Sequence, residues 1–349
     1  MPMKHTKLQK YFPLLKTREE VLSTINADKR LRTIYNKWND TAREEFLLFC
    51  TGQKGIKILY DSFFKEVFNP EYSTERLDRL LSAIMEKKVH IIQILPVDST
   101  RMGDETSLVT MDIVVELEDK SLVNVEVQKI GYFFPGARSA CYSSDLLLRQ
   151  YKRIRDKSTV FSYKKMNPVY TIIFFETSPS EFRAFPNNYI HRFEQKSDTG
   201  LELELLQKYI FISLDNFQKE EHNITNELDA WLLFLSSDKL SDIIFLIENY
   251  PCFKSLYETL FNMCQNIEGV MDMFSRELYE MDKNTELLMV DEFSKNIEEL
   301  KKTVEEKDNI ITESKQALAE KDNIITEKDN IITEKDNIIA ELRAQLAMN

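Results

Sequence analysis

The sequence contains little glycine and proline, with 7 and 9 residues among 349. Few positions can form tight turns, which predicts long regular elements. The 4 cysteines are far from any paired metal-ligand spacing, so we interpret them as reduced, mostly buried thiols and exclude a zinc site. The 4 histidines are scattered singly. They therefore indicate neither a histidine-centred metal site nor a nucleophilic site.

Long hydrophobic runs are also absent. No segment approaches ~18 consecutive apolar residues, which excludes a membrane-spanning helix. The basic residues 1–16 lack the continuous apolar stretch of a signal peptide, so we expect a cytoplasmic protein. No glycine-rich phosphate loop occurs, which leaves ATP-driven chemistry unsupported. The net charge of -12 argues against a uniformly basic nucleic-acid-binding protein but allows a local basic groove.

What remains is the composition of a folded protein, with 43% hydrophobic residues. We predict a helical lead-in over 1–55, an α/β core over 56–217, a helical region over 218–293 and a heptad-repeat helix over 294–349. Within the core, apolar spacing predicts a short helix at 58–68, a capped amphipathic helix from Ser73 to Lys88, and a helix from about Gly136 to Arg155. Strands are predicted at 89–97, 107–118, 121–128, 169–175 and 209–214. The order is helix, three strands, helix, strand.

The second and third predicted strands form a β-hairpin around Asp119-Lys120. Alternation defines two apolar rows, Val109, Met111, Ile113, Val115 and Leu117 in one strand and Val123, Val125 and Val127 in the other. Both rows must cover one core, so the connecting loop needs an odd length or a bulge. Asp112, Glu126 and Gln128 then share the opposite face.

Asp112 and Glu126 are the candidate catalytic and metal-binding groups. Two carboxylates side by side among hydrophobic residues repel each other and lose hydration unless a cation lies between them. Oxygen ligands suit Mg²⁺ or Mn²⁺, which can lower the pKa of water and polarise a phosphoryl oxygen. Gln128 can orient the water or a phosphate oxygen. Spacing alone also allows both acids to be surface carboxylates at a sheet edge.

The pattern Asp112-Ile-Val-Val-Glu, a short turn, then Asn124-Val-Glu-Val-Gln128 resembles the Asp…Glu-x-Gln variant of PD-(D/E)XK nucleases, in particular the nuclease-family transposases related to recombination-promoting nucleases. Flanking segments resemble the same family: Lys57-Ile-Leu-Tyr-Asp-Ser-Phe-Phe-Lys65, Arg138-Ser-Ala-Cys-Tyr142 and Leu146-Leu-Leu-Arg-Gln150. The resemblance covers roughly Trp38 to Phe217.

This resemblance implies a restriction-endonuclease-like mixed sheet flanked by helices and Mg²⁺-dependent cleavage of DNA. Asp112 and Glu126 correspond to the metal-binding acids of the family. Gln128 takes the place of the usual lysine, so the charge that helps align the nucleophile is missing there, and Lys129 points to the opposite face. By its position in the first flanking segment, Asp61 is a further candidate metal ligand or, alternatively, a helix N-cap or surface acid.

The helix at 136–155 carries the candidate DNA contacts. Arg138, Tyr142 and Gln150 lie roughly on one helical stripe and can face the phosphate backbone. Alternatively, Tyr142 belongs to the core and Arg138 to a salt bridge. Arg149 and Arg153 belong to a basic C-terminal end that is a second candidate DNA contact, although a solvated helix end favoured by the macrodipole explains it nearly as well.

The C-terminal tail repeats every seven residues, with three copies of Glu-Lys-Asp-Asn-Ile-Ile-Thr starting at Glu320, Glu327 and Glu334. Its apolar residues fall at adjacent positions such as Ile324-Ile325, so half of any seam is polar and a coiled coil should be weak. The tail predicts a homodimer or higher oligomer; a solvated single helix or an arm packed on the body is the alternative.

The leading hypothesis is therefore a metal-dependent DNA endonuclease of the transposase-like class. Gln128 and the acidic net charge motivate a second hypothesis, a catalytically silent nucleic-acid-binding module. A third is an oligomeric interaction protein in which the nuclease fold serves only as a scaffold. These three hypotheses differ in whether metal, DNA or a second chain is required.

Overall fold

The computed structural model describes residues 8–72, 74–95, 111–130, 135–157, 161–219 and 224–347. The chain forms two compact units, Met1–Asp282 and Lys283–Asn349. One long helix, α12 (Ile267–Ala347), begins in the first unit and makes up the described part of the second. In the described ranges, no helix is both long and apolar enough to cross a membrane. The finer four-part division of the chain stays a prediction.

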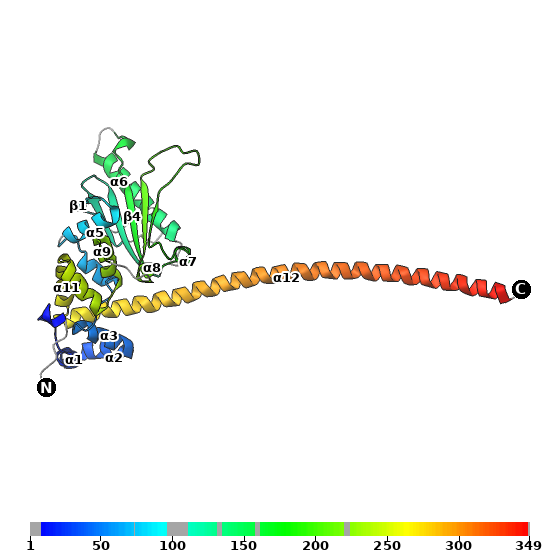
Figure 1. The fold of residues 1–349 in the computed structure, drawn as a ribbon, viewed down its shortest axis with the longest axis horizontal. Coiled ribbons are helices and arrows are strands. Elements are labelled where there is room, and N and C mark those ends of the chain that lie inside the picture. Colours follow the sequence, from blue (N-terminus) through cyan, green and yellow to red (C-terminus); the bar gives the residue numbers. More distant parts are fainter. Residues whose placement is uncertain are drawn as a thin grey trace. The chain divides into compact units, whose positions relative to one another are not determined.

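The first unit contains a six-stranded mixed sheet (Figure 1). The strands β3, β4 and β6 are parallel to one another, and the other neighbours are antiparallel. In spatial order they are β1 (Ile91–Ile94), β2 (Ile113–Leu117), β3 (Leu122–Ile130), β4 (Val169–Thr177), β6 (Gln207–Ser213) and β5 (Ile190–Phe193). The prediction of a mixed sheet flanked by helices is confirmed.

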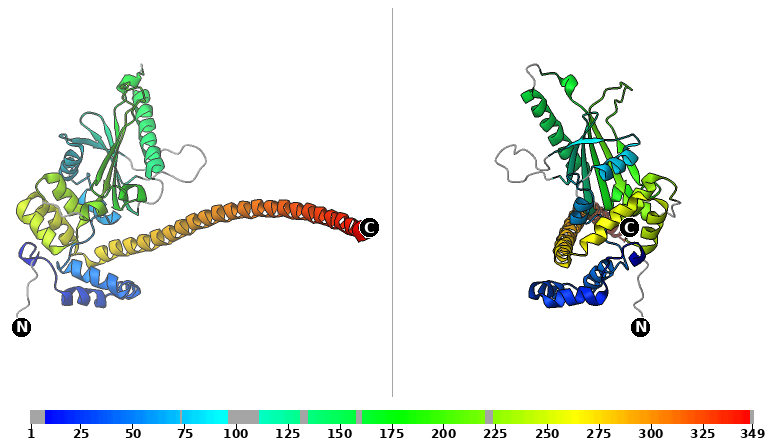
Figure 2. Two further views of the ribbon diagram at one scale, coloured as in Figure 1. Left: turned by 45° about the vertical axis from the view of Figure 1, so that its right-hand side comes forward. Right: turned by 90° about the vertical axis from the view of Figure 1, so that its left-hand side faces the viewer.

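The order of elements in the core is also as predicted: α5 (Glu75–Met85), three strands, α6 (Pro135–Lys157) and β4. The helix α6 connects the parallel strands β3 and β4, which is the usual way to join two parallel neighbours. It lies on one side of the sheet together with the short helix α7 (Ser180–Arg183), whose Phe182 packs on Ile173, Phe175 and Phe211, and α5 lies on the opposite side (Figure 2). The sheet is therefore covered on both faces.

The main hydrophobic core fills the face of the sheet away from α6. Every second residue of β2, β3, β4 and β6 points into this core, because successive side chains of a strand point to opposite faces. The residues are Ile113, Val115, Val123, Val125, Ile172, Phe174, Ile210 and Ile212. The helices that contribute buried residues to this core include α4 (Asp61–Val67), α5, α8 (Leu214–Lys219), α9 (Glu227–Ser236), α10 (Leu240–Asn249) and α11 (Cys252–Met263). Phe64 of α4 meets Phe174 of β4 with ring centroids 6.3 Å apart. The position of α4 is thereby set against the central strand.

The predicted helical lead-in consists of α1 (Arg18–Ala27), α2 (Lys29–Lys37) and α3 (Asp40–Cys50). Side-chain caps begin all three helices, with Thr17 forming a full capping box. The lead-in packs on the first turns of α12, where the Phe274 ring lies 5.2 Å from Trp38 and 5.7 Å from Phe46. Short elements complete the described fold: the 3₁₀ helices Leu8–Lys10 and Tyr163–Lys165 and the helix α7 (Ser180–Arg183).

Several local expectations differ from the structure. The predicted strand 107–118 is shorter in its described part, because pairing begins only at Ile113, and residues 107–110, including Val109, lie outside the described residues. Met111 does not continue the apolar row; it joins a second cluster beneath α6. The helix predicted from Ser73 begins at Glu75 without a side-chain cap from Thr74, while Ser73 itself lies outside the described residues. The strand β5 and the helix α7 were not predicted.

The sequence allows an odd loop length or a bulge in the hairpin between β2 and β3, and the structure has the odd length. Leu117 donates its N–H to the carbonyl of Ser121 at 2.9 Å, which leaves a loop of Glu118, Asp119 and Lys120. The register pairs Ile113 with Val125 and therefore puts both apolar rows on the same face. The loop closes through the left-handed conformation of Lys120, with φ of 67°. The odd number of residues in this loop therefore decides which side chains of β2 and β3 face α6.

Lys120→Gly should raise the free energy of unfolding by about 0.5–1 kcal/mol, because glycine adopts the left-handed conformation without steric cost. Lys120 also forms an ion pair with Glu116 at 3.4 Å, which both this variant and its control lose. Lys120→Ala is the matched control, since it removes the ion pair and keeps a Cβ. Equal denaturation midpoints for the two variants in urea would contradict this account.

Candidate functional site

Asp112 and Glu126 face each other where the β2–β3 ladder opens. They are the next opposite pair after Ile113 and Val125 in the register. The Asp112 N–H donates to Glu126 Oε1 at 3.1 Å, and the Val127 N–H donates to Asp112 Oδ2 at 2.9 Å. Carboxylate oxygens therefore accept hydrogen bonds from two backbone N–H groups that would otherwise pair with carbonyl groups of the neighbouring strand. The pair is held rigidly although like charges directly opposite each other are unfavourable.

Burial perturbs both carboxyl groups. The Glu126 residue is 3% exposed and the Asp112 side chain 18%. Burial, helped by the nearby charge of Asp112, raises the pKa of Glu126 to about 8. Burial also raises the pKa of Asp112, against the opposing effects of the Val127 N–H and the Lys65 ammonium. The pair of carboxyl groups therefore favours binding of a proton or a cation.

The third predicted catalytic residue, Gln128, follows Glu126 on the same face of β3. It is 8% exposed, and its Nε2 atom has no hydrogen-bond partner among the described residues. The hydroxyls of Thr171 on β4 and Ser143 on α6 are likewise buried without a described partner. A buried polar group without a hydrogen-bond partner is unfavourable. This face of the sheet therefore favours the binding of a further polar group from outside the chain.

Asp61 and Lys65 reach the same site from α4. The Lys65 ammonium is 2.9 Å from Asp61 Oδ1 and 3.3 Å from Asp112 Oδ1, so it bridges the two acids. Among the described residues, no three histidine, cysteine, aspartate or glutamate side chains are gathered closely enough to hold a metal ion. Asp61 therefore does not complete a three-acid cluster with Asp112 and Glu126.

Sequence reasoning did not single out Lys65. The available signal was its spacing of four residues from Asp61 in the first family-like segment, which puts both side chains on one face of a helix. Proximity to Asp112 had no such signal, because it joins residues 47 positions apart through the packing of α4 on the sheet. Only the fold brings this ammonium to the acidic pair.

The stripe predicted on α6 splits into an exposed arginine and two buried residues. Arg138 is exposed, and its Nε donates to the Tyr142 hydroxyl at 2.6 Å. Tyr142 belongs to the cluster beneath α6, and its pKa is raised mainly by burial. Gln150 is 2% exposed and uses its amide on the backbone of Asn167, accepting at 2.6 Å and donating at 3.2 Å. Arg138 is thus the member of the stripe that reaches solvent beside the acids.

The two arginines predicted at the basic end of α6 are paired within the protein. Arg149 Nε lies 2.6 Å from Asp145, one turn earlier on the helix. Arg153 lies 2.8 Å from Glu116 of β2, which is 7% exposed. Arg153 therefore compensates a buried carboxylate and attaches α6 to the sheet. Any contact of these two residues with DNA would require them to exchange or share these partners.

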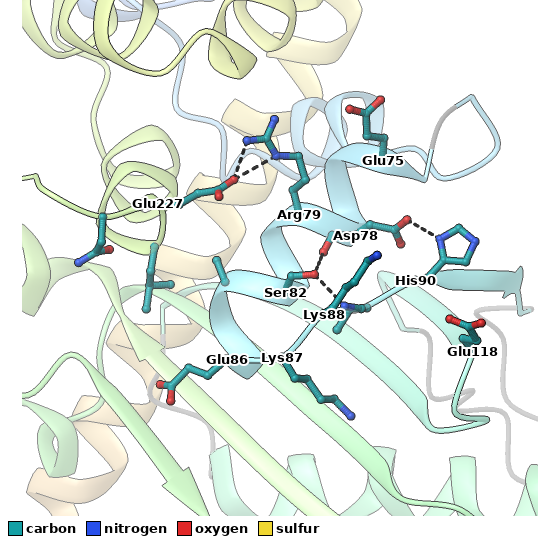
Figure 3. Close-up of a pocket in the computed structure, with 14 residues that line it drawn as sticks. Glu75, Asp78, Arg79, Ser82, Glu86, Lys87, Lys88, His90, Glu118 and Glu227 are labelled. Atoms are coloured by element: carbon teal, nitrogen blue, oxygen red, sulfur yellow. Dashed lines mark hydrogen bonds and ion pairs between the residues drawn. The ribbon is translucent and has the colours of Figure 1, made fainter.

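A separate groove lies between α5, the segment that leads into β1, and the start of α9 (Figure 3). It contains an acid–histidine pair, Asp78 with His90 at 3.1 Å, and the ion pair of Arg79 with Glu227 at 2.8 Å. The nearby Ser82 hydroxyl is engaged by the backbone of Asp78 and Val89. No nucleophile is aligned with His90 among the described lining residues. The acidic pair beneath α6 is the stronger candidate site.

Metal-free protein should lose stability as the pH rises, through Glu126. A carboxyl group with a raised folded pKa contributes stability that is complete below its ordinary value of 4.5 and is lost as the pH rises through about 8. Between pH 5 and pH 9, Glu126→Gln should therefore gain about 4 kcal/mol of unfolding free energy relative to wild type. Urea unfolding with a chelator measures this difference. Parallel pH profiles for the two proteins would exclude the perturbed carboxyl group.

The comparison with known families agrees with this geometry. Residues 58–289 match the family described as PD-(D/E)XK nuclease family transposase, and the match includes α4, the sheet and α6. No curated protein and no solved structure matches the chain. The family supports a nuclease-like function on DNA, and PD-(D/E)XK nucleases generally use divalent metals. Because the match covers more than half of the sequence, the chain belongs to the PD-(D/E)XK nuclease family transposases.

Proposed function

We propose that the protein is a divalent-metal-dependent DNA endonuclease that hydrolyses phosphodiester bonds, with Asp112 and Glu126 as the metal-binding acids. The observation that carries the proposal is the buried pair of carboxylates facing each other just before the start of β2. Their mutual repulsion and lost hydration favour a cation at this point. Family membership supports the choice of DNA as the substrate.

The donor set fits Mg²⁺ or Mn²⁺. Both cations prefer oxygen ligands, and Mg²⁺ is commonly held by one or two carboxylates together with substrate phosphates. A site of two acids is therefore sufficient once DNA is bound. When bound, the cation would lower the pKa of water and stabilise charge on the phosphate. The raised pKa values of both acids indicate how unfavourable the pair is without such a charge.

The surrounding side chains have separate tasks in this proposal. Gln128 has a buried amide N–H₂ available to orient the attacking water or a phosphate oxygen. Arg138 can contact the phosphate backbone, since it is exposed on α6 and its charge acts on Glu126. Arg149 and Arg153 remain weaker candidate DNA contacts, because each already has an acidic partner. Asp61 stays a candidate metal ligand whose present contact is Lys65.

Cleavage of supercoiled and linear DNA tests the proposal. Wild type should cut with Mg²⁺ or Mn²⁺ and stop when a chelator is added. Asp112→Asn and Glu126→Gln should each lower the rate by about 100- to 1,000-fold, because each removes charge that binds the cation. Asp119→Asn is the matched control in the same hairpin, with a side chain that is 51% exposed. It should cut like wild type.

The main competitor is a catalytically silent DNA-binding module, favoured by the amide at position 128. It predicts DNA binding without any metal requirement and no cutting by any protein of the series. Metal-independent binding that is equal in wild type, Asp112→Asn and Glu126→Gln, together with no cleavage, would decide for this competitor. The binding assay therefore uses the same proteins and the same DNA as the cleavage assay.

We also infer that the second unit pairs with a second copy of itself. Seven apolar residues at intervals of seven form a stripe, and each is 46–63% exposed: Ile297, Val304, Ile311, Leu318, Ile325, Ile332 and Ile339. Such an extended apolar stripe is unusual on a monomer. A strict seven-residue repeat fits another helix with the same repeat in a left-handed supercoil.

The positions three residues after the stripe explain both the weakness and the register of this pairing. They are apolar near the ends, at Leu300 and Leu342, and mostly lysine between them. The lysines reduce the apolar area that can be buried. The three identical repeats would also pair after a shift of seven residues, but such a shift mismatches the two apolar ends. The ends therefore favour one alignment.

Replacing Ile325 and Ile332 together by glutamate should convert the self-associated full-length protein to monomer, because both residues lie on the stripe. The matched control replaces Asn323 and Asn330 by glutamate, which adds the same charge on an exposed face off the stripe. Light scattering measures the mass of each protein across a concentration series. A monomeric wild type, or equal masses for both variants, would argue against pairing through the stripe.

A further inference from the structure

The acidic site lacks a lysine where the family pattern normally has one. Gln128 occupies that place with an uncharged amide. Lys129 cannot substitute, because its ammonium forms an ion pair with Glu277 and lies 5.1 Å from the centroid of the Tyr60 ring. A phosphodiester transition state carries more negative charge than the ground state and benefits from a cationic group. The described site needs this charge from elsewhere.

Lys65 is the described lysine or arginine whose charge lies within ion-pair distance of the acidic pair. Its ammonium is 3.3 Å from Asp112 Oδ1, and its side chain is 42% exposed. The backbone beneath it is held firmly: the Ser62 N–H donates to the buried Glu277 at 3.0 Å, and Phe64 packs on Phe174. Lys65 therefore combines a fixed Cα with a long flexible stem that opens toward solvent.

We propose that Lys65 supplies the positive charge that Gln128 does not, and that Asp61 is the positioning residue that holds Lys65. This inference rests on the proposed nuclease function. In the metal-free protein the Lys65 ammonium neutralises Asp112 in part. With a divalent cation held by Asp112 and Glu126, the Lys65 ammonium would leave that oxygen and contact a non-bridging oxygen of the scissile phosphate, while Asp61 would retain it.

The chemical step balances without any further reactant. A water oxygen forms the new bond to phosphorus, and the bond from phosphorus to the leaving deoxyribose oxygen breaks. The water gives up a proton to solvent, and the leaving oxygen takes one from solvent. Lys65 keeps all its protons and acts only by stabilising negative charge on the phosphate oxygens. No electron is transferred.

The proposal predicts opposite effects on metal binding and on catalysis. Lys65→Met removes a charge that competes with the cation, so the full-length protein without DNA should bind Mn²⁺ about tenfold more tightly by calorimetry. The same variant should cleave DNA about 100-fold more slowly in single turnover at saturating Mn²⁺. Lys65→Arg should recover part of that rate. If the Lys65 ion pair were merely structural, Lys65→Met would not bind Mn²⁺ more tightly and at the same time cleave DNA more slowly.

Lys57→Met is the matched control. Lys57 lies in the same segment, is 43% exposed and pairs with Glu176 at 2.7 Å, away from the acidic pair. Its Mn²⁺ affinity and cleavage rate should equal those of wild type. Lys65→Gln is the second variant if the methionine form does not fold.

A double-mutant cycle separates the two roles of Asp61. If Asp61 acts through Lys65, Asp61→Asn slows wild type but has no further effect on Mn²⁺ affinity or cleavage in the Lys65→Met background. A metal ligand would lower Mn²⁺ affinity in both backgrounds, which would overturn the assignment of Asp61. Unchanged Mn²⁺ affinity in Lys65→Met, or equal losses of affinity and rate, would overturn the role of Lys65.

Failure of this inference is distinguishable from failure of the proposed function. Wild type that cuts DNA and loses Mn²⁺ affinity on Glu126→Gln supports the nuclease, whatever Lys65→Met does. Wild type that neither cuts nor binds Mn²⁺ through Glu126 would overturn the nuclease and the role of Lys65 together.

Discussion

The arrangement of this protein depends on one unfavourable contact, the pair of carboxylates Asp112 and Glu126 facing each other across two strands. The fold tolerates it because each carboxylate accepts a backbone N–H beside the other, from Asp112 and Val127. These bonds fix the geometry but do not remove the repulsion. Burial, together with the nearby charge of Asp112, raises the pKa of Glu126 to about 8. A contact of this kind stores free energy that a bound cation can release.

Two features of the fold maintain the pair. The three-residue loop after Leu117 sets the parity of the hairpin, so the apolar rows of β2 and β3 enter the main core and the acids face α6. Glu277, in the first turns of α12, then joins the backbone of Ser62 on α4 to Lys129 on β3. This buried network holds α4, and with it Asp61 and Lys65, against the strand that carries Glu126. The helices that follow the sheet thus contribute to the site without lining it.

Much of α6 serves packing more than recognition. Tyr142 and Gln150 lie against the sheet, and Arg153 neutralises the buried Glu116. Periodicity put Arg138, Tyr142 and Gln150 roughly on one stripe but did not reveal which of them face the sheet. A charged residue on an amphipathic helix looks the same in sequence whether its partner is a phosphate or a carboxylate on a neighbouring strand. The choice follows from contacts between residues far apart in the chain.

The sequence by itself determined the elements whose signal is local. Alternation in β2 and β3, the all-apolar β4 and the seven-residue repeat each need only neighbouring residues to be recognised. The sequence also limited the hairpin to an odd loop length or a bulge, because two apolar rows must share one core. Tertiary structure decided what depends on long-range packing: the start of β2 directly after Asp112, the packing of Met111 in the cluster beneath α6, and the approach of Lys65 to Asp112. Local propensity does not encode those contacts, because they form only when α4 and the sheet pack together.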